Sequence, residues 1–172
     1  MTLLEGRADW IYFEQHLARH ATEMADSTVT YMGSAADLIA CYDQEMWARF
    51  TGPWQRVFTY DGDDGEIVAH CVLTGMGGIT GHRCRLGLAV EGAYRRKGVG
   101  RALMREALSW ACDQPSLEWV DGEAVSENTA VLSLDFSEGF RVSGLVLDAA
   151  RVNGRSVNVT LLALNLGERR SL

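Results

Sequence analysis

The sequence has no apolar run long enough to cross a membrane as a helix, which takes about 18 residues or more. Its first residues also lack the basic stretch followed by an apolar segment that is typical of a secretory signal. Both absences argue against a membrane-embedded or exported protein. We therefore expect a cytoplasmic chain with no membrane partner.

Cysteine is scarce and widely spaced. The four cysteines, Cys41, Cys71, Cys84 and Cys112, form no Cys-x-x-Cys pair. Structural zinc sites commonly use such pairs, and small disulfide-stapled domains are much denser in cysteine. We expect buried free thiols and no bound metal.

Basic residues are too few for a surface that holds nucleic acid. The chain carries 16 Lys and Arg against 23 Asp and Glu, a formal net charge of −7. Nucleic acid is held through many Lys and Arg side chains on one face, so we expect no such partner. An amine or another cationic substrate suits the acidic chain better. The local exception is the basic group Arg95, Arg96, Lys97 and Arg101, which suggests an anionic ligand there.

The composition is that of one folded domain. Hydrophobic residues make up 47% and charged residues 23% of the chain, as in ordinary globular proteins. Two independent cores within 172 residues would each be marginal. We expect a single domain over residues 1–172, in which residues 1–27 hold an extra N-terminal helix. That helix would cover the acceptor site, mediate dimerisation or pack on the core.

Periodicity and turn chemistry indicate an alternating series of elements. Helices are predicted over residues 9–25, 34–50, 98–113 and 128–137. Strands are predicted over residues 28–32, 56–60, 67–73, 82–90, 117–125, 140–151 and 156–164. The Asp-rich segment 61–65 and Asn153-Gly154 predict hairpin turns, and the former lacks the ligand spacing of a calcium loop. The expected class is α/β (α+β), with a mixed, mostly antiparallel twisted sheet and a central strand-helix-strand unit.

Residues 90–103 join a strand to an amphipathic helix. Gly98 and Gly100 let the backbone approach a ligand closely, and the first N–H groups of a helix are unpaired and favour a phosphate. Neighbouring guanidinium groups can bind phosphate oxygens in pairs. The sequence therefore predicts a pyrophosphate-binding turn, with a solvated basic loop as the alternative. The Gly-Lys-Ser/Thr ending of a Walker loop and the third glycine of a dinucleotide-binding turn are both missing.

The same residues resemble the GNAT superfamily of N-acetyltransferases. Arg95-x-x-Gly98-x-Gly100 matches its Arg/Gln-x-x-Gly-x-Gly/Ala signature. Residues 128–140 look like its Asn-x-x-Ala-x-x-Leu-Tyr-x-x-x-Gly-Phe pattern, and the resemblance spans residues 67–164. It implies the acyl-CoA N-acyltransferase fold and acetyl-CoA as cosubstrate. The cofactor contacts that it implies are Leu88, Ala89, Val90, Arg95, Arg96, Lys97, Gly98, Val99, Gly100, Arg101 and Asn128.

The resemblance also implies catalytic residues. Glu123 stands where the family has a Glu that orients or deprotonates the amine through water, and His82, which titrates near neutral pH, is the second candidate base. Asp135 stands where the family usually has the Tyr that protonates the CoA thiolate. Because an ordinary Asp is ionised at neutral pH, three outcomes are open: burial protonates Asp135, the thiolate leaves unaided, or the protein binds acetyl-CoA without fast transfer. We favour the second, because a thiolate is a tolerable leaving group.

These features favour transfer of an acetyl group from acetyl-CoA to a primary amine of a small molecule, by direct attack in a ternary complex. Residues 149–157 are similar to a subgroup that acetylates free amino acids and small amines. Acetylation of protein or peptide amines is one alternative. A non-catalytic acyl-CoA-binding sensor is another, because Asp135 replaces the usual acid. A homodimer is compatible with each of them.

Overall fold

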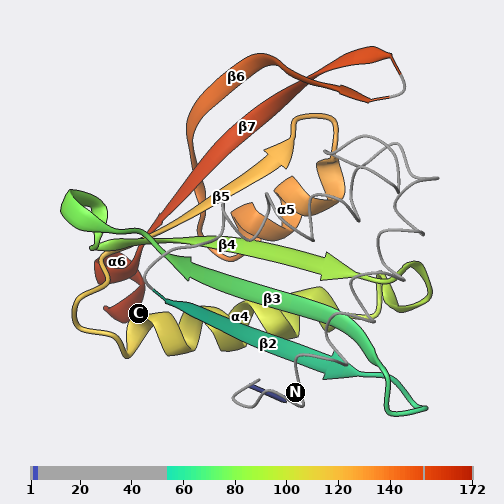
Figure 1. Cartoon of the computed structure of the whole chain (residues 1–172), viewed down its shortest axis with the longest axis horizontal. Coiled ribbons are helices and arrows are strands. Elements are labelled where there is room, and N and C mark those ends of the chain that lie inside the picture. The colour runs from blue at the N-terminus through green and yellow to red at the C-terminus, as the bar shows by residue number, and fades with distance from the viewer. Residues whose placement is uncertain (1, 4–53, 153, 172) are drawn as a thin grey trace.

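The computed structural model of the chain describes residues 2–3, 54–152 and 154–171, which form one seven-stranded sheet. The strands are β1 Thr2–Leu3, β2 Gln55–Asp61, β3 Ile67–Gly75, β4 Arg83–Val90, β5 Trp119–Val125, β6 Arg141–Val152 and β7 Arg155–Asn165. Their order across the sheet is β1-β2-β3-β4-β5-β7-β6 (Figure 1). The elements predicted over residues 9–50 lie outside the described residues.

Antiparallel pairing dominates the sheet. β3 pairs antiparallel with β2 and β4, and β7 pairs antiparallel with β5 and β6. Among the described strands, only β4 and β5 run parallel, because helix α4, Val99–Cys112, carries the chain back between them. The predicted mixed, mostly antiparallel sheet with a central strand-helix-strand unit is confirmed.

Helix α4 closes a core on one face of the sheet. Its apolar side chains Leu103, Ala107 and Leu108 are fully buried in one cluster with Leu73 of β3 and Val120 of β5. Two further helices follow. The helix α5, Thr129–Ser137, was predicted from the sequence, whereas the short α6, Leu166–Arg170, was not. No helix within the described ranges is long and apolar enough to cross a membrane.

Both predicted hairpin turns are present, and two of the three described cysteines are buried as expected. The Gly62 N–H donates to the Glu66 carbonyl over 2.8 Å and closes the first hairpin turn. The second hairpin joins β6 to β7 with Gly154 at φ 76°, a left-handed conformation that favours glycine. Cys71 and Cys84 are buried free thiols and Cys112 is a half-buried one.

Candidate active site

A gap between β4 and β5 exposes one backbone edge of β4. The two strands pair only over residues 83–85 of β4 and 119–121 of β5, and beyond these the described residues show no pairing on that side of β4. Figure 1 shows the strands separating toward the end of β4 at which α4 begins, with α5 beside the widening. A parallel sheet that opens in this way leaves N–H and C=O groups without strand partners.

The alternation of hydrogen bonds identifies the groups that face this gap. The Glu91 N–H donates to the Val68 carbonyl of β3 over 3.0 Å, so odd-numbered positions of β4 bond to β3. The even-numbered Leu88 and Val90 therefore turn their N–H and C=O groups toward the gap, while Ala89 bonds to β3. Leu88 and Val90, two of the three predicted cofactor contacts on β4, thus present backbone groups to the gap, whereas Ala89 does not.

The base of the gap is held by a side-chain pair. Nε of Arg83 donates to Oδ2 of Asp121 over 2.8 Å, and its Nη2 donates to Oδ1. The Arg83 guanidinium also lies 5.2 Å from the centroid of the Trp119 ring. The hydrogen bond with Asp121 raises the pKa of Arg83. This two-pronged pair joins the first paired position of β4 to the last paired position of β5, just before the strands separate.

The predicted phosphate turn follows β4 directly. Gly98 caps α4 with φ 85°, and the first intrahelical bond runs from the Ala102 N–H to the Gly98 carbonyl over 3.0 Å. Within the described residues, no backbone carbonyl accepts from the N–H groups of Val99, Gly100 or Arg101. Three unpaired donors and the positive end of the helix dipole therefore meet at the end of β4.

Gly100 lies where the turn packs on its neighbours. A Cβ at this position would lie 3.3 Å from Cγ2 of Val90, 3.5 Å from Cδ2 of Leu88 and 3.7 Å from Cδ2 of Leu134. The first turn of α4 thus lies directly on β4 and on α5, with little room for a side chain larger than that of alanine.

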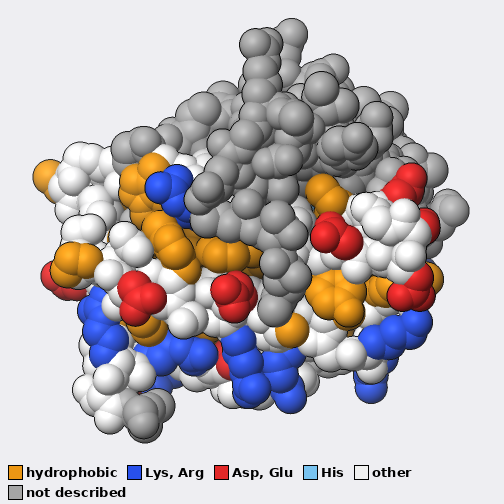
Figure 2. Space-filling view, turned by 90° about the horizontal axis from the view of Figure 1, so that it is seen from below, with side chains coloured by type: hydrophobic (Ala, Val, Ile, Leu, Met, Phe, Trp, Pro, Cys, Tyr) orange, Lys and Arg blue, Asp and Glu red, His pale blue; other side chains and the backbone are white. Residues whose placement is uncertain are grey.

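The four predicted cations do not act alike. Nε of Arg95 donates to the Val90 carbonyl over 2.8 Å and so binds the turn to the strand end. Nζ of Lys97 lies 5.1 Å from the centroid of the Tyr94 ring, a cation–π contact. Arg96 is exposed with φ 62°. Figure 2 shows that Lys and Arg side chains gather along one edge of the face that it draws, although the chain as a whole is acidic.

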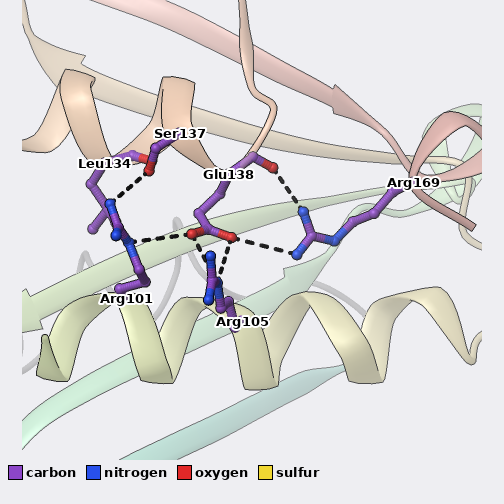
Figure 3. A network of polar contacts seen from close by, with 6 residues as sticks. All are labelled: Arg101, Arg105, Leu134, Ser137, Glu138 and Arg169. Carbon is purple, nitrogen blue, oxygen red and sulfur yellow. Dashed lines mark hydrogen bonds and ion pairs between the residues drawn. The ribbon is translucent and has the colours of Figure 1, made fainter. Parts of the chain in front are cut away.

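Arg101, the fourth cation, contacts α5. Its Nη2 donates to Oγ of Ser137 over 3.0 Å, and its Nε lies 3.4 Å from Oε1 of Glu138. The Glu138 side chain, only 3% exposed, also receives Nε of Arg105 over 3.0 Å at both oxygens, and lies 3.6 Å from Nη2 of Arg169 (Figure 3). Glu138 was not predicted as a site residue, because no local sequence pattern marks a pairing between residues more than 30 positions apart.

Helix α5 carries two of the predicted residues. Asn128 caps it, with Oδ1 accepting from the Val131 N–H over 3.3 Å. The Asp135 side chain is buried, at 6% exposure for the residue, and burial raises its pKa from 3.8 to about 7. Burial therefore favours the protonated form of Asp135, which is the first of the three outcomes above.

The two candidate bases lie in different places. Glu123 is exposed on the part of β5 that has left β4, and alternation from buried Val120 and Ala124 puts it on the face opposite α4. His82 lies in the turn before β4. Eight residues of strand, about 26 Å, separate it from the phosphate turn. The structure thus brings Glu123, but not His82, to the gap.

Comparisons with known proteins identify the family and the fold. The sequence model described as the Acetyltransferase (GNAT) family matches residues 17–134. No curated protein gives a significant match to the sequence. Many solved structures share the fold, all of those compared below at low identity.

One is an acetyltransferase of the GNAT family from Streptococcus pneumoniae, with 18% identity over 95% of this chain and 98% of that chain, at a TM-score of 0.74. A phosphinothricin acetyltransferase from Sinorhizobium meliloti, in complex with acetyl-CoA, has 15% identity over 97% and 89%, at 0.78. A ribosomal-protein-alanine N-acetyltransferase from Brucella melitensis has 18% identity over 96% and 99%, at 0.74.

Proposed function

The chain belongs to the Acetyltransferase (GNAT) family and is an N-acetyltransferase, and we propose that it transfers the acetyl group of acetyl-CoA to a primary amine of a small molecule. The observation that carries this proposal is two neighbouring sets of backbone donors that have no partner among the described residues. One set, at Leu88 and Val90, lies on the edge of β4, and the other, at residues 99–101, lies in the first turn of α4.

The described residues fit the chemistry of an acyl-CoA ligand. The pantetheine arm carries amide groups, which can pair with the backbone of Leu88 as an added strand would. The diphosphate suits the unpaired N–H groups of residues 99–101, with Arg96 and Lys97 supplying nearby positive charge. Asn128 at the start of α5 can contact the same ligand through its amide nitrogen, because its oxygen already caps the helix.

Each step of acetyl transfer then has a candidate group. Acetyl-CoA supplies an acyl group on a thiolate leaving group. The Val90 N–H, which faces the gap, can donate to the thioester oxygen and stabilise the charge that develops there. Glu123 accepts a proton from the ammonium form of the acceptor through water, and Asp135 donates a proton to the departing sulfur.

The two carboxyl groups belong to elements on opposite sides of the sheet. Glu123 lies on the face opposite α4, whereas Asp135 comes from α5, whose Leu134 packs on the α4 side. An acceptor amine that enters on the Glu123 side meets a thioester whose sulfur lies toward Asp135. This arrangement favours direct attack in a ternary complex over transfer through a covalent enzyme adduct.

A small cationic acceptor suits the charge on the entry side. The chain carries a net charge of −7, and Glu123 is exposed where β5 diverges from β4. A primary amine is protonated at neutral pH, so an exposed carboxylate both attracts it and can take up its proton.

The test is a thiol-release assay with acetyl-CoA and a panel of amino acids, aliphatic amines, polyamines and short peptides. Turnover with small amines supports the proposal, and calorimetry on the same samples gives the affinity for acetyl-CoA. Turnover with peptides alone would contradict a small-molecule acceptor and indicate a protein or peptide acceptor. Tight binding of acetyl-CoA without any turnover would point to the non-catalytic sensor.

A further inference from the structure

One buried carboxylate joins three helices at the edge of the proposed site. Glu138 follows α5 as its C-terminal cap, and its side chain meets Arg101 and Arg105 of α4 and Arg169 of α6 (Figure 3). Nη1 of Arg169 also donates to the Glu138 carbonyl over 2.8 Å. A carboxylate at 3% exposure is costly to bury unless charged partners compensate it, and three guanidinium groups do so here.

The contact with Arg101 reaches the turn proposed to bind the diphosphate. Arg101 is the third residue of α4 and its own N–H is one of the unpaired donors. Its side chain holds Ser137, whose Oγ donates to the Leu134 carbonyl over 2.7 Å. The Leu134 side chain in turn lies where a Cβ on Gly100 would meet it at 3.7 Å. The last turn of α5 therefore rests on the first turn of α4.

The contact with α5 reaches the proposed acid. The Asp135 carbonyl accepts from the Glu138 N–H over 3.1 Å and from the Phe140 N–H over 3.0 Å. Asp135 and Glu138 thus lie in the same hydrogen-bonded C-terminal turn of α5. We expect that a displacement of Glu138 also displaces Asp135. Arg101 and Glu138 connect the phosphate turn to the proton donor through one ion pair.

We propose that Glu138 is a positioning residue, whose carboxylate holds Arg101 against the end of α5 and so sets the distance between the diphosphate anchor and Asp135. The proposal rests on the function proposed above. It gives Arg101 a role other than direct phosphate binding, because its guanidinium is directed at Ser137 and Glu138. The distance between the diphosphate site and the thioester site would then be fixed by the protein.

The experiment compares Glu138→Gln, Arg101→Met and the double variant in the full chain. A loosened anchor still binds acetyl-CoA but presents its sulfur poorly, so kcat should fall on the order of tenfold while KM for acetyl-CoA stays within about threefold. The double variant should be no slower than Glu138→Gln, because Arg101→Met removes a contact that Glu138→Gln already removes. Additive losses, or a raised KM with unchanged kcat in Arg101→Met, would overturn the proposal.

A matched control separates positioning from loss of stability. Arg170 donates to the carbonyls of Cys112, Gln114 and Leu117, at the other end of α4. Arg170→Met should lower the melting temperature and leave kcat unchanged at a temperature where the protein is fully folded. If Glu138→Gln behaves in the same way, Glu138 is only structural and the proposal fails. Arg101→Met keeps the test available if Glu138→Gln does not fold, since Arg105 and Arg169 still pair with Glu138.

Amide hydrogen exchange gives a readout that does not require turnover. Binding of CoA should slow exchange across residues 129–137 in the native protein, and this protection should be lost in Glu138→Gln although CoA still binds. Equal protection in both proteins would overturn the positioning role alone. A native protein that binds no CoA would overturn the proposed function, and the positioning role would fall with it.

Discussion

Asp135→Asn tests whether burial keeps a proton on the carboxyl at the proposed acid position. The pKa of Asp135 is raised from 3.8 to about 7 because its charged form is poorly solvated. The unfolded chain releases this proton near pH 4, whereas the folded protein keeps it until about pH 7. Between these values the folded state binds more protons, so its stability falls as pH rises through this window and is constant above it.

The magnitude follows from the width of that window. At about 1.4 kcal/mol for each pH unit, the interval from 3.8 to about 7 corresponds to at most about 4 kcal/mol. Asparagine has nearly the same shape and never ionises, so it removes the pH-dependent part. The stability of Asp135→Asn relative to the native protein should therefore grow by up to about 4 kcal/mol between about pH 4 and pH 8.

Urea unfolding at a series of pH values measures this difference, with Asp113→Asn as the control for loss of one exposed carboxylate. The same variant has a kinetic consequence. As pH rises through about 7, native kcat should decline as Asp135 loses its proton, and the variant should be slower and lack that decline. A stability difference that stays constant from pH 4 to pH 8 would refute protonation by burial.

Three further predictions concern the proposed ligand site. Glu123→Gln should lower kcat, because the acceptor loses the group that takes up its proton; an unchanged kcat would exclude Glu123 as the base. Gly98→Val should cost about 1–3 kcal/mol of stability and abolish acetyl-CoA binding in calorimetry, because φ 85° disfavours a β-branched residue, whereas Gly98→Asn should fold nearly as well as the native protein. Lys97 is the only lysine in the chain. Saturating CoA should slow its reaction with an amine-directed acylating reagent, with the N-terminal amine as internal control, and equal rates by mass spectrometry would argue against a diphosphate at the turn.

The features that the sequence predicted correctly are those set by neighbouring residues. Gly98 marks the turn because only a residue without a Cβ adopts φ 85° at little cost. The strand before it and the amphipathic helix after it follow from apolar periodicity over fewer than 20 residues. Such local signals also located the hairpins at residues 61–65 and 153–154, and the fold class follows once the strand-helix-strand unit is recognised.

The features that it missed depend on contacts between distant parts of the chain. The order β5-β7-β6, in which the last strand inserts between two earlier ones, has no local marker. The same holds for the hydrogen bonds of Arg170 to residues more than 50 positions earlier, which anchor α6. Pairings of this kind are decided by how the sheet closes, and the alternation of polar and apolar residues is equally compatible with several of them.

Arg101 and Asp135 show why a site residue can be located from sequence while its chemistry is not. Arg101 lies in the predicted turn, yet its guanidinium pairs with a carboxylate 37 positions later, and the role proposed for it above is to hold α5 rather than to bind phosphate. Asp135 lies at the position of the usual Tyr, and its ordinary pKa argued for an unaided thiolate. Burial moves that pKa to about 7, within the range in which a carboxyl group can donate a proton at neutral pH. The type and position of both side chains follow from the sequence. The ion-pair partner of Arg101 and the protonation of Asp135 depend on the folded structure.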